Sequence, residues 1–133
     1  MTAETQIPST SKKMLWAGRI ISALPVLLML FGAVLAVVKP ATITEGMARY
    51  GYPERYAHRI LIVEMACVAL YAIPQTAVLG AILLTGYLGG ATATHVRAAE
   101  PFIMPVIVGV LVWLGLFFRD ARVRTLIPFR RTG

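Results

Sequence analysis

The sequence predicts an all-α fold, an integral-membrane four-helix bundle with both termini in the cytoplasm. Hydrophobic residues make up 58% of the 133 residues and charged residues only 14%, whereas soluble domains average roughly 45–50% and 25%. The hydrophobic residues fall into long blocks, and about 20 apolar residues are needed to cross a hydrocarbon core roughly 30 Å thick. Lys and Arg gather near the ends of these blocks.

The first two predicted helices differ in how clearly they can span a membrane. The first covers residues 15–38, is interrupted only by Arg19 and Pro25, and is long enough to span with some tilt. The second covers residues 57–74, which is short for a span, and it carries Glu64. We expect neighbouring helices to shield this carboxyl group from the hydrocarbon.

The third and fourth helices and the two tails complete the chain. The third helix is expected at 76–93 and the fourth at 102–118. Pro101 precedes the fourth helix and is a helix-start signal, because proline lacks a backbone N–H and the first helical position would leave that N–H unpaired in any case. The Thr, Ser, Gln and Pro residues of segment 1–13 predict a disordered cytoplasmic tail. Residues 129–133 form a basic C-terminal tail that suits anchoring on anionic lipid headgroups.

The distribution of Lys and Arg predicts the orientation, because positive residues are retained on the cytoplasmic side. The side of the termini holds eight of them, Lys12, Lys13, Arg19, Arg119, Arg122, Arg124, Arg130 and Arg131, and the other side holds five, Lys39, Arg49, Arg55, Arg59 and Arg97. Residues 39–56 and 94–100 then become outer connections. We expect Arg19 to extend towards the headgroups or to pair with Asp120.

Two function classes are excluded by composition. The net charge of +7 would suit nucleic acid only with a basic patch on a soluble fold, which this chain lacks, so no nucleic-acid partner is expected. The single cysteine, Cys67, lies among apolar residues and cannot form an internal disulfide, which excludes a thiol–disulfide relay within the chain. No metal-ligand spacing is present, and no metal site is expected.

Ionisable side chains are costly inside a membrane, so those in the helices are candidates for function. The second helix runs inward and the third runs back outward. Glu64 lies roughly 9 Å below the start of its helix, and the matching depth on the next helix, counted back from His95, is near Tyr87. We therefore expect a Glu64–Tyr87 hydrogen bond. Glu64, Tyr87 and His95 are the candidate proton-transfer or ligand-binding groups.

A second set of polar residues is predicted at the outer ends of the same two helices. His58 and Arg59 begin one helix, and His95, Arg97 and Glu100 follow the end of the other. The antiparallel arrangement places both histidines and a carboxylate at one membrane face. We expect these residues to form an outer-face polar cluster.

The glycines of the third helix allow two interpretations. Gly86 and Gly90 form a G-x-x-x-G motif and, with Gly89, give the helix a groove that lets another backbone approach closely. Helix packing is therefore the first interpretation. In the second, the missing side chains leave space for a ligand beside Glu64 and Tyr87.

The segments GRIISALPVLLMLFGAV (18–34), GYPERYAHRILIVEMACVALYAIP (51–74) and TAVLGAILLTGYLGGATATHVR (76–97) closely resemble the DoxX-like family of small bacterial membrane proteins. The resemblance covers residues 14–128. It implies a four-helix domain in the bacterial inner membrane, related to the small subunit of an archaeal thiosulfate:quinone oxidoreductase. Glu64, His95 and Arg97 match polar positions of the family.

Three functions fit these residues and the resemblance. The first is a redox-associated, quinone-linked subunit or accessory protein that binds an apolar ligand, in which Glu64, Tyr87 and His95 exchange protons and a partner supplies electrons. The second is a small intramembrane acid–base enzyme, such as an isomerase or epoxide-opening enzyme acting on an apolar substrate. Its discriminating feature is one closed cavity lined by both Glu64 and His95. The third is a non-catalytic assembly or transport module that uses Gly86 and Gly90.

The expected surroundings of the protein follow from the same reasoning. No cofactor is evident in the sequence, and quinone is the one that the first function would involve. The expected partners are membrane lipid, a redox partner protein and further copies of the chain, and the expected location is the bacterial inner (cytoplasmic) membrane, crossed several times. Residues 39–56 carry Tyr50, Tyr52 and Tyr56, which suit a lid as well as an interfacial belt.

Overall fold

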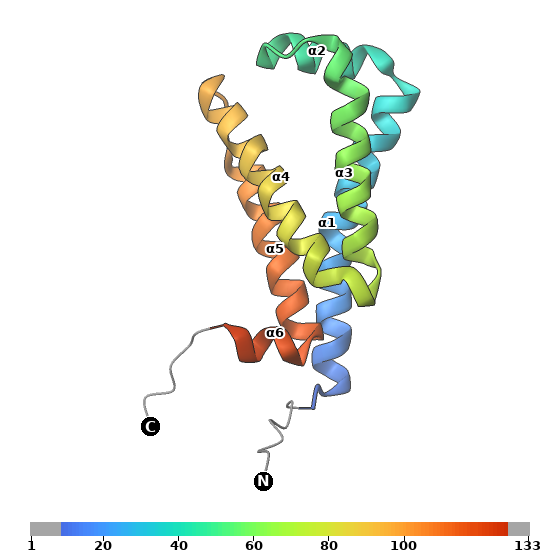
Figure 1. The fold of residues 1–133 in the computed structure, drawn as a ribbon, viewed down its shortest axis with the longest axis vertical. Helices are drawn as coiled ribbons and strands as arrows, with labels where there is room; N and C mark the ends of the chain where they lie inside the picture. Colours follow the sequence, from blue (N-terminus) through green and yellow to red (C-terminus); the bar gives the residue numbers. More distant parts are fainter. Residues whose placement is uncertain (1–8, 128–133) are drawn as a thin grey trace.

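The computed structural model describes residues 9–127, and every regular element in that range is helical (Figure 1). The elements are α1 (Lys12–Val38), α2 (Pro40–Tyr50), η1 (Glu54–Tyr56), α3 (Ala57–Ala72), η2 (Pro74–Thr76), α4 (Ala77–Arg97), α5 (Ile103–Arg119) and α6 (Ala121–Leu126). The all-α prediction is confirmed. Lys12 and Lys13, at the end of the tail predicted for residues 1–13, belong to α1. Residues 1–8 of this tail and the basic tail at 129–133 lie outside the described residues.

Local sequence signals set the helix ends. Ser11 caps α1 by accepting a hydrogen bond from the backbone nitrogen of Met14 at 3.2 Å. Pro40 begins α2, and α3 ends just before Pro74, because a residue that precedes proline disfavours the helical conformation. Gly51 ends α2 with a φ of 73°, a left-handed conformation that glycine adopts without steric cost. The outer connection 39–56 therefore contains a helix of its own.

The exterior of the molecule is apolar. Phe31, Ile62 and Val110 are each about 60% exposed or more, at 62%, 67% and 59%, and the outward faces of the long helices carry many such side chains. By length and composition, Lys12–Val38 and Pro74–Arg97 can each cross a membrane, while α5 is apolar but has 17 residues. Large contiguous apolar surfaces mark contact with lipid or protein rather than water. The molecule is that of a membrane protein.

The core lies in the half of the molecule near the two chain ends. The most extensive packing is between α1 and α5, followed by α3 with α4 and α4 with α5. Tyr71 is fully buried there with Leu84 and Leu116. Its hydroxyl donates a hydrogen bond to the Val112 carbonyl oxygen at 2.7 Å and lies 3.0 Å from Ser22 Oγ. We call this region the inner half.

Three glycines allow the helices of the inner half to approach closely. A methyl group added to Gly115 would lie 2.8 Å from the backbone nitrogen of Ser22 on α1. One added to Gly18 would collide with the backbone of α5, and one added to Gly80 would collide with the backbone of Tyr71. These small residues, which the sequence reasoning missed, provide the close helix contacts that membrane bundles require.

Gly86, Gly89 and Gly90 make no close helix contact within the described chain. A methyl group added to any of the three would have no described neighbour within 4 Å. The physical reason is that α3 and α4 lie close together at η2 and diverge towards α2 (Figure 1). At the height of these glycines no other helix of the described chain is near enough to use the groove.

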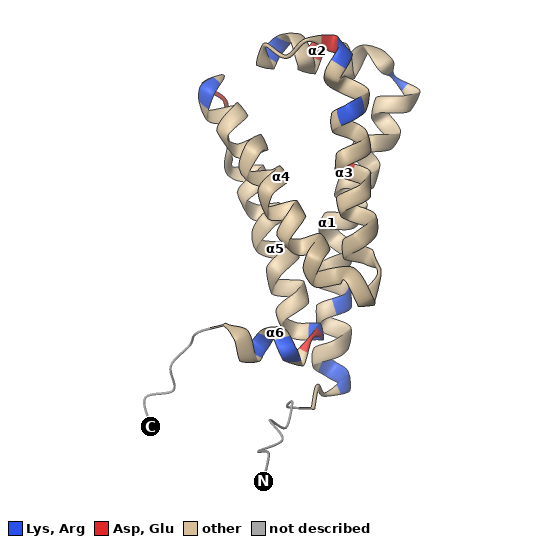
Figure 2. Cartoon of the chain, viewed as in Figure 1, with Lys and Arg blue, Asp and Glu red and all other residues tan. Residues whose placement is uncertain are grey.

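Charges gather at the two ends of the molecule and leave the middle of the helices nearly bare (Figure 2). At the inner end Arg124 donates a hydrogen bond to Thr10 Oγ1 at 2.8 Å, so both ends of the described chain lie together. The expected pairing of Arg19 with Asp120 is not formed. Asp120 instead caps α6 and lies 3.7 Å from the Nε of Arg122. Arg19 lies over the ring of Trp16 at 5.2 Å.

Candidate functional site

The divergence of α3 and α4 leaves a cleft of about 430 Å³ below α2. It is lined mainly by apolar and aromatic groups, with a few polar atoms from α4. We call it the outer cleft, and its lining consists of Met47, Tyr50, Tyr52, Ile60, Gly86, Tyr87, Gly90, Ala91, Thr94 and His95. Its size is that of a small-molecule site.

The predicted hydrogen bond between Glu64 and Tyr87 is present. The Tyr87 hydroxyl donates to Glu64 Oε2 at 3.0 Å, and both side chains are half-buried. Glu64 itself lines a smaller adjoining cavity of about 200 Å³, which shares Met47, Tyr50 and Ile60 with the outer cleft. Tyr87 thus connects a carboxyl group inside the bundle to the wall of the outer cleft.

His95 lies at the other end of the outer cleft and holds a defined orientation. Its Nδ1 is 2.7 Å from the carbonyl oxygen of Ala91, an acceptor, so Nδ1 carries a proton. Its Nε2 is 3.2 Å from the hydroxyl of Tyr50, and that hydroxyl donates to Glu100 Oε2 at 3.0 Å. An imidazole, a phenol and a carboxylate therefore form a continuous chain of groups that can exchange protons.

Further contacts tie the C-terminal end of α2 to the end of α4. Arg49 Nε lies 3.3 Å from Glu100 Oε1, Arg97 donates to the Tyr50 carbonyl oxygen at 2.8 Å, and the Tyr52 hydroxyl is 2.8 Å from Thr94 Oγ1. We call this set the outer latch, and its members are Arg49, Tyr50, Tyr52, Thr94, His95, Arg97 and Glu100. It places α2 over the outer end of the cleft.

Tyr50 is the central residue of the outer latch. Its burial, followed by its hydrogen bond to Glu100 and the charge of that carboxylate, raises the pKa of Tyr50 above the usual 10.0. The hydroxyl therefore stays protonated and can donate at all moderate pH values. The sequence signal for this role was the pair of tyrosines that flanks Gly51.

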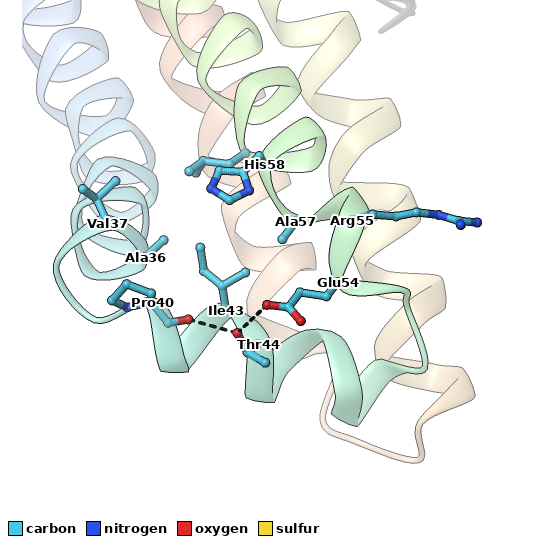
Figure 3. Close-up of a pocket in the computed structure, with 10 residues that line it drawn as sticks. Ala36, Val37, Pro40, Ile43, Thr44, Glu54, Arg55, Ala57 and His58 are labelled. Atoms are coloured by element: carbon cyan, nitrogen blue, oxygen red, sulfur yellow. Dashed lines mark hydrogen bonds between the residues drawn. The ribbon is translucent and has the colours of Figure 1, made fainter.

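The outer-face polar cluster forms only in part. His95, Arg97 and Glu100 join the outer latch, but His58 points towards α1 and lines a separate cavity of about 500 Å³ (Figure 3). There Glu54 Oε1 is 3.3 Å from Thr44 Oγ1. The guanidinium group of Arg59 lies over the ring of Tyr56 at 5.7 Å. The first turn of α3 directs these side chains away from α4, so the two histidines do not share a site.

The residues of the site indicate the chemistry that it can support. Residues 9–127 contain no group of three or more His, Cys, Asp or Glu that could hold a metal ion. Cys67 is buried and is the single cysteine of the chain. The outer cleft has the Tyr87 hydroxyl on its wall and an imidazole at its end, and Tyr87 bonds to Glu64 of the adjoining cavity, so the site can bind an apolar ligand and exchange protons with it.

Comparison with known proteins identifies the family of the chain. A family model for the DoxX-like family matches residues 20–115, a range that includes Glu64, Tyr87 and His95. No curated protein and no solved structure matches the chain. The resemblance stated from the sequence is confirmed.

Proposed function

The chain belongs to the DoxX-like family, and from this premise we propose that it is a quinone-binding, redox-associated subunit or accessory protein of the bacterial inner membrane. The quinone ring occupies the outer cleft. A partner protein supplies the electrons, because the chain has no motif for haem, flavin or an iron–sulfur cluster.

The proposed topology has four crossings, by α1, α3, α4 and α5, with both termini in the cytoplasm. The apolar outward faces of the helices and the shared position of the two described chain ends support it. So does the excess of Lys and Arg at the end of the termini, which includes Arg130 and Arg131 outside the described residues. α3 has 16 residues, about 24 Å at 1.5 Å per residue, and spans the core with the help of η1 and η2.

One observation carries the ligand assignment: Tyr87 on the wall of the mainly apolar outer cleft donates a hydrogen bond of 3.0 Å to the carboxyl group of Glu64. A quinone has a flat apolar ring and carbonyl oxygens that accept hydrogen bonds. Its reduction to the quinol takes up two electrons and two protons. Tyr87 and His95 both line the cleft, and each can deliver a proton to a quinone oxygen when that oxygen replaces its present partner, Glu64 for Tyr87 and Tyr50 for His95 Nε2.

The other two functions have less support. An acid–base enzyme that uses Glu64 and His95 together needs both on one closed cavity, but Glu64 lines the adjoining cavity and His95 lines the outer cleft. An assembly role for Gly86 and Gly90 needs a helix in their groove. Both glycines line the outer cleft instead, which favours a ligand over helix packing.

The test is the quinone content of the purified protein. Wild type, Glu64→Gln and Tyr87→Phe are purified in a mild detergent, and bound quinone is quantified by mass spectrometry and by absorbance. We expect wild type to retain quinone and both variants to retain about tenfold less, because each loses a hydrogen bond that involves a charged or buried group. Wild-type protein without quinone would contradict the proposal.

A matched pair of glycine variants controls for general damage to the fold. Gly90 lines the outer cleft and Gly89 does not, although neither has a described neighbour within 4 Å of an added methyl group. Gly90→Val should fill the cleft and lose the quinone, while Gly89→Val should keep it. Equal retention by both variants would mean that the quinone is bound elsewhere.

A further inference from the structure

The inner end of the molecule carries two cavities that meet at Arg19 and Arg119. The first, of about 260 Å³, lies among α1, η2, α5 and α6 and also contains Asp120 and Arg122. The second, of about 190 Å³, extends from the two arginines along α1 past Ala23 to Val26. Both cavities are remote from the outer cleft and have no part in the proposed quinone site.

The first cavity has more positive charge than its carboxylate can balance. Three arginines face one carboxylate, and Asp120 is already engaged with Arg122 and with the start of α6. Arg19 has no carboxylate within 4 Å among residues 9–127. Charged groups at the hydrocarbon boundary need a counter-charge or a route to water. A phosphate group in this cavity would supply the counter-charge.

Arg119 is held in a fixed position and keeps hydrogen-bonding capacity. Its guanidinium group lies over the ring of Tyr71 at 4.8 Å and donates to the Tyr71 carbonyl oxygen at 3.1 Å. Its Nε is buried and has no hydrogen-bond partner within the described part of the chain. A buried donor without a partner costs free energy, and a planar guanidinium group is well matched to phosphate oxygens.

The second cavity suits an acyl chain. Ala23 and Val26 continue from Arg19 along α1 towards the middle of the molecule, with Ala72 on the facing α3. Val26 is seven residues beyond Arg19, about 10 Å along the helix axis. A phosphate at the arginines and an apolar groove leading from it have the spacing of a phospholipid headgroup and the first part of its chain.

We propose that Arg19 and Arg119 form a binding site for an anionic phospholipid. The phosphate lies between the two guanidinium groups, and one acyl chain follows the groove along Ala23 and Val26. A zwitterionic lipid is disfavoured, because three arginines against Asp120 and one phosphate leave a net positive charge in the cavity, which would repel a cationic headgroup. The site selects lipid by charge at one membrane surface.

The experiment uses Trp16, which lies beside Arg19 and is one of two tryptophans in the chain. Trp113→Phe serves as the parent, so that Trp16 alone fluoresces. The protein is reconstituted into phosphatidylcholine vesicles that contain increasing fractions of brominated phosphatidylglycerol or brominated phosphatidylcholine, and quenching of Trp16 is measured. Arg19→Gln is the test variant because among residues 9–127 the Arg19 side chain makes no hydrogen bond or ion pair that the fold would lose, and Lys13→Gln removes a neighbouring exposed charge as the matched control.

In the parent we expect brominated phosphatidylglycerol to reach half-maximal quenching at a mole fraction about fivefold lower than brominated phosphatidylcholine. Arg19→Gln should abolish this preference and Lys13→Gln should keep most of it. Equal quenching by the two lipids, or equal loss in both variants, overturns the proposal in favour of a diffuse surface charge. Displacement of the brominated lipid by millimolar inorganic phosphate would assign the site to free phosphate and not to lipid.

Discussion

The inner and outer halves of α4 use the same residue type for opposite purposes. Gly80 lies against the backbone of Tyr71 and leaves no space for even a methyl group, whereas Gly86, less than two turns along the same helix, has no described neighbour within 4 Å. The difference arises because α3 and α4 meet at η2 and diverge towards α2 (Figure 1). A small residue packs a helix only where a second backbone is close, and elsewhere it opens space.

The tyrosines of the two halves repeat this contrast. Tyr71 is fully buried, and its hydroxyl is satisfied by Val112 and Ser22. Tyr87 is half-buried at a cleft wall and bonds to Glu64, a group that can itself gain or lose a proton. The inner half therefore holds polar groups that stabilise the fold, and the outer half holds polar groups that remain available to a ligand.

The largest expected effect is the difference in stability between two variants that each add a methyl group to α4, one at Gly80 and one at Gly86. Gly80→Ala should lower the free energy of unfolding by about 3 kcal/mol, because the backbone of α3 must move to admit the methyl group. Gly86→Ala should raise it by about 0.5–1 kcal/mol, because alanine favours the helix and meets nothing. Reversible unfolding in mixed micelles measures both values. A similar loss in the two variants would mean that the halves do not differ in packing.

A smaller effect on stability is expected from removing the hydroxyl group of Tyr71 or of Tyr87 in separate variants. Tyr71→Phe should lower the free energy of unfolding by about 1 kcal/mol, since the hydrogen bonds to Val112 and Ser22 are lost inside the core. Tyr87→Phe should change stability by less than half of this. The same unfolding measurement compares them, and a larger loss for Tyr87→Phe would assign the outer hydroxyl a structural role.

The smallest effect concerns the outer latch at alkaline pH. Since the pKa of Tyr50 is raised above 10.0 in the folded protein, its contribution to stability is fully present below pH 10 and is lost as the pH rises through the folded-state pKa. The ultraviolet titration of ionised tyrosine, taken as wild type minus Tyr50→Phe, should show a midpoint above 10. In a Glu100→Gln background this midpoint should fall towards 10, and an unchanged midpoint would exclude the carboxylate as a cause.

The sequence predicted the long helices and the Glu64–Tyr87 hydrogen bond well, because both depend on short-range regularities. The apolar blocks and prolines located the long helices to within a few residues, and the rise per residue of antiparallel helices placed Tyr87 at the depth of Glu64. The direction in which a helix faces its neighbour depends on its rotation about its own axis, which the length and depth of the helix do not give. The sequence therefore predicts His58 beside His95, whereas the first turn of α3 directs it towards α1.

The packing glycines show the same limit. The G-x-x-x-G motif drew attention to Gly86 and Gly90, but the stripe of Ala77, Gly80 and Ala81 is the buried one. Both stripes have helical spacing and small side chains. Which of them meets a neighbour depends on where the two helix axes cross, and that is a property of the whole assembly.

The dominance of α1–α5 packing has a consequence for the order in which the molecule folds. α3 and α4 are joined directly by η2, so their contacts form after closing a very short loop, whereas α1 must wait for a segment far along the chain. During synthesis from the N-terminus, Ser22 can bond to Tyr71 of α3 early, but Gly18 has no backbone to pack against until Gly115 and Arg119 of α5 have been made. The hairpin that carries Glu64 and Tyr87 thus assembles first, and the helix that closes the inner half arrives last.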